Sequence, residues 1–276
     1  MRNKPRTFDS DNRSDPDFPV LGIHDRFAFP DTDETQGSVV AVGGNLSPGM
    51  IVSAYSQGIF PWFNDDDPLY WQSPDPRFVI LPETFHVPTR LAREMKKNLF
   101  TVKTDTAFER VIQYCALVAR DGQNGSWITD DMIEAYTELH KLGVAHSIES
   151  WQNGNLVGGF YGVYMGSVFF GESMFTRVSD ASKTAFATFA GHFFDNMKGS
   201  IIDSQVYTDH VARFGGMNIS RSAYLRKLRD GLYEHNADRA ALASDDATGS
   251  DEANRCDSIV LHQGLWQPDS LMHSAE

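Results

Sequence analysis

The sequence predicts an α+β protein with a small N-terminal domain and a larger domain built on a mixed, mostly antiparallel sheet flanked by helices. Three observations predict this class. Apolar, aromatic segments at residues 144–151, 156–164 and 167–175 are separated by two tight turns, as in an antiparallel meander. A helix pattern follows from Ala181 to about Asn196, with Ser179 or Asp180 as its cap. A short strand pattern then runs from Ser200 to Val206.

The N-terminal part divides into an extension and a small domain. Residues 1–37 are rich in Asp, Arg and Pro, and we expect this acidic extension to be partly disordered. In the small domain, residues 38–76, Ser47 is expected to cap a helix that runs from Pro48 to about Gln57, and Gly58 ends it. The following aromatic run contains prolines that exclude a regular helix, so its rings either pack a domain junction or line a pocket.

The larger domain is expected to span residues 77–235, with a flexible acidic tail at 236–276. Before the meander its pattern gives two strands and three helices, and one more helix follows the last strand. The expected elements are a strand at Phe78–Leu81, a basic helix at Pro88–Asn98, a strand at Leu99–Lys103, a helix at Thr106–Ala119, a helix at Asp131–Leu142 capped by Asp130, and a final helix at Ser222–Leu232.

The net charge of −13 is unevenly distributed. Residues 1–37 hold 5 basic and 8 acidic side chains and residues 236–276 hold 2 and 8, so residues 38–235 carry only −4. Within them, the segment from Arg77 to Lys103 has a net charge of +4. Its basic helix carries the candidate phosphate-binding side chains Arg90, Arg93, Lys96 and Lys97, although the same pattern is typical of a solvated helix surface.

Composition indicates a soluble, cytoplasmic protein without a metal. No apolar run approaches the length of about 20 residues that spans a bilayer. The N-terminus lacks the apolar region of a signal peptide. The two cysteines, Cys115 and Cys256, do not form a disulfide framework, and no His or Cys cluster has metal-ligand spacing.

Two strands carry acids among apolar residues. Asp203 and Gln205 lie two positions apart, so an extended strand would point both side chains the same way. Glu172 lies in the strand before the phenylalanine-rich helix. A buried carboxylate needs a partner or a function, which makes this region a candidate site. The simpler readings are a capping role for Asp203 and core packing for the phenylalanine stripe.

The order of elements resembles the acyltransferase fold of the GNAT superfamily. Its acetyl-CoA-binding members carry a glycine-rich pyrophosphate loop before the helix that follows the meander. Here that segment, Thr176–Ser182, contains no glycine and has Asp180 where the diphosphate would lie. Coenzyme A is therefore not expected as a cofactor.

Nine short motifs in order across residues 38–230 give a more specific resemblance: GGNLSP, GIFPWF, WQSPDPR, WIT, HSIE, VGGFYGV, GESMF, SKTA and IDSQV. With them the chain resembles the leucyl/phenylalanyl-tRNA–protein transferase family. The resemblance implies transfer of leucine or phenylalanine from aminoacyl-tRNA to the N-terminal α-amine of proteins that begin with Arg or Lys, which marks them for degradation by the N-end rule. Because the donor is an activated ester, neither a cofactor nor a metal is expected.

The resemblance also assigns roles to residues. It places Asp203 and Gln205 at the reacting centre, and we expect Asp203 to orient Gln205 toward the attacking amine or a water. Glu172 is expected to bind the basic side chain of the acceptor, unless it forms a structural ion pair with Arg177 or Lys183. The family's pocket for the donated side chain corresponds to Trp62, Trp127, Phe160, Phe169, Phe186, Phe189, Phe193 and Ile202.

Other functions share parts of this pattern. Aminoacyl transferases that build peptidoglycan cross-bridges have the same fold, but they usually contain two such domains and this chain is too short for both. A tRNA-binding module with a degenerate site would bind tRNA without transferring an amino acid. A CoA-dependent acetyltransferase would need the missing phosphate loop. No apolar stripe predicts self-association, so we expect a monomer without membrane contacts.

Overall fold

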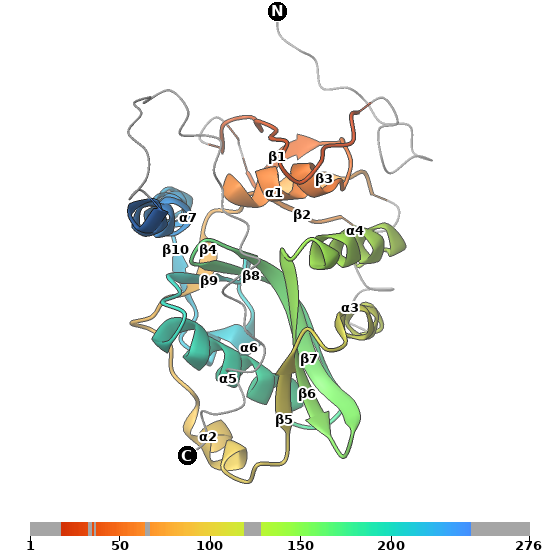
Figure 1. Ribbon diagram of the computed structural model, residues 1–276, viewed down its shortest axis with the longest axis vertical. Coiled ribbons are helices and arrows are strands. Elements are labelled where there is room, and N and C mark those ends of the chain that lie inside the picture. Colours follow the sequence, from red (N-terminus) through yellow and green to blue (C-terminus); the bar gives the residue numbers. More distant parts are fainter. Residues whose placement is uncertain (1–17, 33–34, 36, 64–66, 119–127, 244–276) are drawn as a thin grey trace, which may run out of the picture.

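The computed structural model describes residues 18–32, 35, 37–63, 67–118 and 128–243, and for residues 234–243 it describes the backbone alone. It contains a three-stranded sheet in the N-terminal part and a seven-stranded sheet in the rest of the described chain (Figure 1). Every strand pair is antiparallel except one. The α+β class with a mixed, mostly antiparallel sheet is therefore confirmed.

The small sheet and one helix form the N-terminal domain. Its order is β1-β3-β2, with β1 at Val39–Val42, β2 at Phe60–Pro61 and β3 at Tyr70–Gln72. Helix α1, Pro48–Ser56, begins and ends close to the predicted residues. Ser47 occupies its N-cap position but makes no cap bond, because its hydroxyl accepts the backbone N–H of Leu21 at 3.0 Å. The backbone N–H groups of Phe27 and Phe29 likewise donate to the side chains of Ser53 and Gln57, so this segment runs along the helix.

The large sheet has the order β10-β4-β9-β8-β7-β6-β5. The meander β6-β7-β8 is confirmed, and its first hairpin turns at Asn153 and Gly154, both with positive φ. Gly166, in the second turn, also has a positive φ, so both predicted turns are confirmed. The strands are β4 (Arg77–Ile80), β5 (Thr101–Thr104), β6 (Ala145–Gln152), β7 (Asn155–Met165), β8 (Val168–Thr176), β9 (Ile201–Asp203) and β10 (Met217–Ile219).

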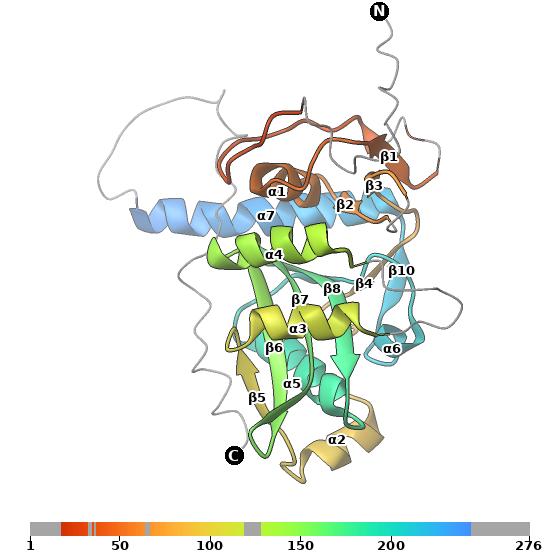
Figure 2. The same cartoon turned by 90° about the vertical axis from the view of Figure 1, so that its right-hand side faces the viewer.

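Helices cover both faces of the large sheet. Figure 1 shows α5 on one side of the sheet and α3 and α4 on the other, and α7 runs beside the N-terminal domain in both views (Figure 2). The helices are α2 (Thr89–Met95), α3 (Phe108–Ala116), α4 (Asp130–Lys141), α5 (Ala181–Asp195), α6 (Asp209–Ala212) and α7 (Arg221–Ala243). Strand β10 and helix α6 were not predicted, and α7 is longer than expected while α2 is shorter.

The helix caps differ from the predictions in their chemistry. Thr129, rather than Asp130, caps α4 and accepts the N–H of Met132 at 3.3 Å. Asp180 occupies the N-cap of α5 in a left-handed conformation, but its carboxylate binds Lys183 at 2.8 Å instead of a backbone amide. Helix bounds therefore followed from the apolar pattern more reliably than from the choice of capping residue.

Two apolar cores lie on the two faces of the large sheet. The core on the α3 and α4 side is continuous with that of the N-terminal domain, so Met50 of α1 and Tyr136 of α4 belong to one cluster. The core on the α5 side is aromatic and contains Phe160, Phe169 and Phe189. Because the first core is shared, the N-terminal domain packs together with the α3 and α4 side of the large sheet.

Among the described residues, none of the helices has both the length and the apolar character required to cross a membrane.

Candidate active site

A pocket opens where strands β8 and β9 separate. The two strands pair in parallel only at Val168–Phe170 with Ile201–Asp203. Beyond Asp203 the chain leaves the sheet at Gln205, whose φ is +57°. The next residues of β8, including Glu172 and Met174, therefore have no neighbouring strand on that side and line the pocket.

The pocket has a volume of about 410 Å³ and receives side chains from both domains. The N-terminal domain contributes Phe60, Pro61 and Trp62. The rest of the lining is Phe160, Tyr161, Gly171, Glu172, Ser173, Met174, Phe186, Ile202, Asp203, Ser204, Gln205, Val206, Thr208, His210 and Val211. The lining therefore combines apolar and aromatic side chains with the carboxylate of Glu172 and the amide of Gln205.

Four of the eight predicted pocket residues line this cavity. Trp62, Phe160, Phe186 and Ile202 line the cavity. The predicted Phe169, Phe189 and Phe193 differ: they have no exposed surface and pack behind the lining. Phe160, for example, lies 5.6 Å from Phe189 between ring centroids. Trp127 lies outside the described residues.

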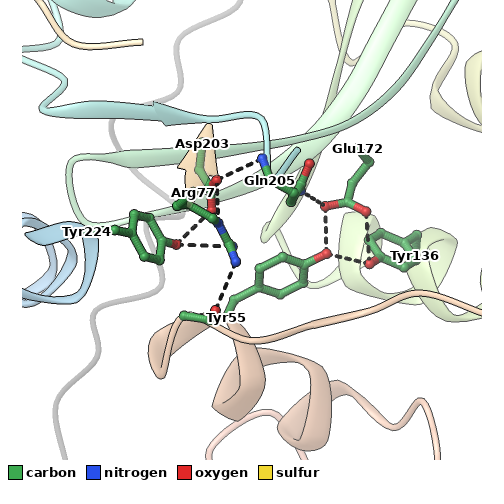
Figure 3. A network of polar contacts seen from close by, with 8 residues as sticks. Tyr55, Arg77, Tyr136, Glu172, Asp203, Gln205 and Tyr224 are labelled. Atoms are coloured by element: carbon green, nitrogen blue, oxygen red, sulfur yellow. Dashed lines mark hydrogen bonds and ion pairs between the residues drawn. The ribbon is translucent and has the colours of Figure 1, made fainter. Parts of the chain in front are cut away.

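Asp203 is fully buried and its carboxylate is saturated with donors. Arg77 donates to it twice, from Nε to Oδ1 at 2.9 Å and from Nη2 to Oδ2 at 2.6 Å (Figure 3). The Tyr224 hydroxyl donates to Oδ2 at 2.7 Å, and the backbone N–H of Gln205 donates to Oδ1 at 2.9 Å. Each carboxylate oxygen already accepts two hydrogen bonds, so Asp203 has no lone pair left for a further donor.

Arg77 is equally buried, and it makes hydrogen bonds to residues of both domains. Its Nη1 donates to the carbonyl oxygen of Gly58, in the N-terminal domain, at 3.1 Å. Burial alone would lower its pKa, but the paired carboxylate of Asp203 keeps that pKa above its ordinary value. The guanidinium also stacks on the Tyr224 ring, 4.4 Å from its centroid. The pair thus fixes the end of β9 against the N-terminal domain.

Glu172 forms the second polar cluster of the site. The Tyr55 hydroxyl donates to its Oε1 at 2.6 Å, and the Tyr136 hydroxyl donates to its Oε2 at 3.3 Å (Figure 3). The side-chain amide of Gln205 donates to Oε1 at 3.1 Å. Burial raises the pKa of Glu172 to about 7, against the two tyrosine hydroxyls, which lower it. Its charge is therefore sensitive to pH near neutrality.

The alternative role for Glu172, a structural ion pair with Arg177 or Lys183, is wrong. Lys183 pairs instead with Asp180, and the guanidinium of Arg177 lies over the Tyr114 ring, 3.9 Å from its centroid. Within the described residues, the partners of Glu172 are neutral hydroxyl and amide donors. A cationic ligand therefore has no resident cation to displace.

The expected alternation of Asp203 and Gln205 on one strand is also wrong in its details. The strand ends at Asp203, three residues before the predicted end at Val206, and Gln205 adopts a left-handed conformation. Both residues nevertheless line the pocket, because the Asp203 carboxylate holds the Gln205 backbone. The orienting contact that we expected thus exists, but it is made to the backbone N–H.

The candidate tRNA-binding side chains lie on α2 and just beyond it. Arg90, Arg93, Lys96 and Lys97 are all exposed. Lys97 is engaged by Glu94 at 2.7 Å, which reduces its availability to a ligand. The helix ends at Met95, so Arg90 and Arg93 share a helical face while Lys96 and Lys97 follow its end.

Models of a known family match most of the described chain. Residues 44–75 match the N-terminal domain of the leucyl/phenylalanyl-tRNA protein transferases, and residues 79–229 match the main domain of the same family. The chain belongs to the leucyl/phenylalanyl-tRNA–protein transferase family. The pocket between β8 and β9 lies within the matched part.

Curated members of this transferase family are similar over most of their length. The leucyl/phenylalanyl-tRNA–protein transferase of Myxococcus xanthus is 49% identical over 207 residues, which cover 75% of this chain and 88% of that protein. The enzyme of the same name from Solidesulfovibrio magneticus is 48% identical over 211 residues, covering 76% and 85%. That of Desulforapulum autotrophicum is 44% identical over 215 residues, covering 78% and 93%.

Four residues of this transferase's site escaped the sequence reasoning: Tyr55, Arg77, Tyr136 and Tyr224. Arg77 carried the clearest signal, because a guanidinium that opens the apolar strand RFVI must be buried beside an acid. The three tyrosines lie in ordinary helix patterns, and nothing in their local sequence distinguishes a site tyrosine from a core one. The described residues contain no group of three or more His, Cys, Asp or Glu placed to hold a metal.

Proposed function

We propose that this protein transfers leucine or phenylalanine from aminoacyl-tRNA to the N-terminal α-amine of proteins that begin with Arg or Lys. The observation that carries the proposal is the lining of the pocket in a chain of this family, which combines aromatic side chains with the hydrogen-bonded Glu172 and Gln205. The product marks its acceptor for degradation by the N-end rule. Because the donor is aminoacyl-tRNA, we place the reaction in the cytoplasm.

The aromatic wall suits the donated side chain. Phe160, Phe186 and Ile202 present apolar surface to the cavity, and the buried Phe189 fixes Phe160 from behind. A leucine or phenylalanine side chain fills such a slot, whereas a branch at Cβ would collide near the backbone. One methyl group is worth only about 1–3 kcal/mol in such a pocket, so discrimination against isoleucine and valine is limited.

The polar edge suits the acceptor. Glu172 offers a carboxylate to the guanidinium or ammonium of the first residue, and such charge-assisted hydrogen bonds are about twice as strong as neutral ones. The positive charge of the bound acceptor would lower the pKa of Glu172 from about 7 and stabilise its ionised form. Binding of an acceptor that begins with Arg or Lys thus favours the ionised form of Glu172, which in turn binds the cation.

Gln205 lies beside Glu172 and is our candidate for contact with the attacking amine, either directly or through a water. The amine nitrogen attacks the ester carbonyl carbon, and the bond from that carbon to the ribose oxygen breaks. The proton lost by the amine passes to the leaving oxygen. Alignment of amine and ester is the main requirement, since the ester is already activated. Asp203 contributes by holding Gln205 in place.

The direct test supplies purified protein with leucyl-tRNA and a peptide that begins with Arg. The proposal predicts a product longer by one leucine. Binding of leucyl-tRNA without the extended peptide would instead identify a tRNA-binding protein with an inactive site.

A further inference from the structure

A second cationic surface lies beyond the end of the pocket. It consists of Lys103 on β5, Arg110 and Tyr114 on α3, Trp151 on β6 and Arg177 after β8, and we call it the Tyr114–Trp151 surface. The three cations are exposed on a chain whose net charge is −13. None of the three forms an ion pair within the part of the chain that the structure describes. Such a group of unpaired cations needs an explanation.

The cations are held on two aromatic rings. Arg177 lies 3.9 Å and Arg110 5.9 Å from the Tyr114 centroid. Lys103 lies 5.4 Å and Arg110 5.5 Å from the Trp151 centroid. Arg110 and Arg177 each hydrogen-bond with the Tyr114 side chain, and a guanidinium has further N–H donors that suit phosphate oxygens.

The two rings are themselves fixed from behind. Tyr114 packs edge-on against the buried Phe175, with 5.1 Å between centroids. The indole N–H of Trp151 donates to Glu149 at 3.1 Å. Glu149 is fully buried and also accepts from Thr106, Ala107 and Ser147, so its charge is directed inward. Glu109 is the exposed acid next to Arg110 in the sequence.

Strand β8 connects the surface to the pocket, and the charge of Arg90 on α2 acts near the same end of that strand. Met174 lines the pocket and Arg177 follows three residues later, a distance of about 10 Å along an extended chain. Asp180 follows Arg177 in the chain. The hydrogen bond from Lys183 lowers the pKa of Asp180, and the charge of Arg90 on α2 also lowers it. The cations of the surface and those of α2 thus flank the same end of β8.

We propose that the Tyr114–Trp151 surface binds phosphates of the RNA that carries the donated amino acid. The inference rests on the proposed function and adds a contact region to it. An acidic protein partner would also suit three cations, but the acceptors in this reaction begin with a cation and would be repelled. The rings are already covered by cations, so the contact is to the backbone and not to bases.

The test measures binding of uncharged leucine tRNA at several salt concentrations. The variant combines Lys103→Gln, Arg110→Gln and Arg177→Gln. Its matched control, Arg226→Gln with Lys227→Gln and Arg229→Gln, removes three exposed charges from α7, which lies beside the N-terminal domain (Figure 2). We expect the variant to bind about 10- to 100-fold more weakly at 0.1 M salt, with the slope of log affinity against log salt flatter by about 2–3. The control should bind like the wild type.

Equal binding and equal slopes in the variant and the wild type would overturn the proposal, as would an equal loss in the α7 control. A raised KM for the peptide with unchanged tRNA binding would assign the surface to the acceptor and also overturn it. Arg110→Lys with Arg177→Lys keeps the charges and should keep the slope while losing part of the affinity. Transfer of leucine by the wild-type protein is measured in a separate assay. A protein that binds tRNA through this surface but transfers no leucine would contradict the proposed function and not the proposed contact surface.

Discussion

Asp203 and Arg77 show why a pocket-lining acid need not be the reacting group. Both side chains are fully buried, and the carboxylate accepts four hydrogen bonds from three residues. We predict that Asp203→Ala lowers the free energy of unfolding by about 3–5 kcal/mol, because it leaves an uncompensated guanidinium in the interior. Urea denaturation measures this value. A loss below about 1 kcal/mol would mean that the pair does not hold the two domains together.

Gln205 should behave in the opposite way. Within the described residues its side chain makes one hydrogen bond, to Glu172, and its backbone contact with Asp203 survives truncation. We predict that Gln205→Ala reduces the transfer rate at saturating substrates by about 10²–10⁴-fold, the range typical of a positioned proton-transfer group. The unfolding transition should remain close to that of the wild type. Wild-type turnover in Gln205→Ala would remove this residue from the reaction.

Glu172 gives the site a defined pH dependence. Its pKa of about 7 lies above the ordinary value of 4.5, so between these values the folded protein holds the proton more tightly than the unfolded chain. Its contribution to stability therefore falls as pH rises through this window. Acceptor binding requires the carboxylate, so we predict that KM for an Arg-initiated peptide decreases by up to about tenfold from pH 6 to pH 8.

Two variants isolate this effect from titration of the peptide amine. Glu172→Gln should remove the part of the pH dependence that belongs to the enzyme. Tyr55→Phe removes a hydroxyl that lowers the pKa of Glu172, so the KM profile should move to higher pH. If the profiles of the wild type and Glu172→Gln coincide, the carboxylate does not bind the acceptor.

At the scale of elements, the apolar periodicity of the sequence predicted which helices and strands form, but it did not predict all of their ends. The apolar pattern predicted α5 from Ala181 and the meander β6-β7-β8, since period and turn residues agree there. It could not predict that β9 ends at Asp203, because that boundary is set by contacts with Arg77 and Tyr224 from distant parts of the chain. The small sheet was missed because its strands are only two to four residues long.

The junction between α1 and α7 depends on a glycine. Gly58 has φ +75°, and a Cβ there would lie 2.4 Å from Leu225 Cδ2 and 3.0 Å from Tyr224 Cε1. We predict that Gly58→Ala destabilises the protein by about 1–3 kcal/mol. Gly154→Ala is the matched control, because its φ of +77° is similar but its surroundings are open. Equal losses of unfolding free energy in both variants would show that backbone strain, and not the α7 contact, causes the effect.

For the whole molecule, charge distribution matters more than net charge. The chain carries −13, yet Arg90 and Arg93 on α2 are exposed and unpaired in the described residues. We predict that Arg90→Gln with Arg93→Gln flattens the salt dependence of tRNA binding by about 2, whereas Lys97→Gln changes it less because Glu94 already neutralises that lysine. Filter binding at graded salt tests both. Unaltered slopes in the double variant would exclude α2 as a contact.

The site itself exists only in the assembled molecule. Tyr55 and Glu172 are 117 positions apart, and Arg77 and Asp203 are 126 apart. Motif positions indicated Glu172, Asp203 and Gln205 as site residues, but the hydroxyls that surround Glu172 come from α1 and α4. No local sequence pattern predicts contacts between side chains so far apart in the chain. The shared core between the N-terminal domain and the α3 and α4 face brings them together.

The most direct test of the central claim compares peptides that begin with Arg and with Ala in transfer from leucyl-tRNA. The account predicts that the wild type strongly prefers the Arg-initiated peptide. Glu172→Gln should lose most of this preference and still transfer leucine. A Glu172→Gln enzyme that retained the full preference for Arg would contradict the assignment of this pocket edge to the acceptor.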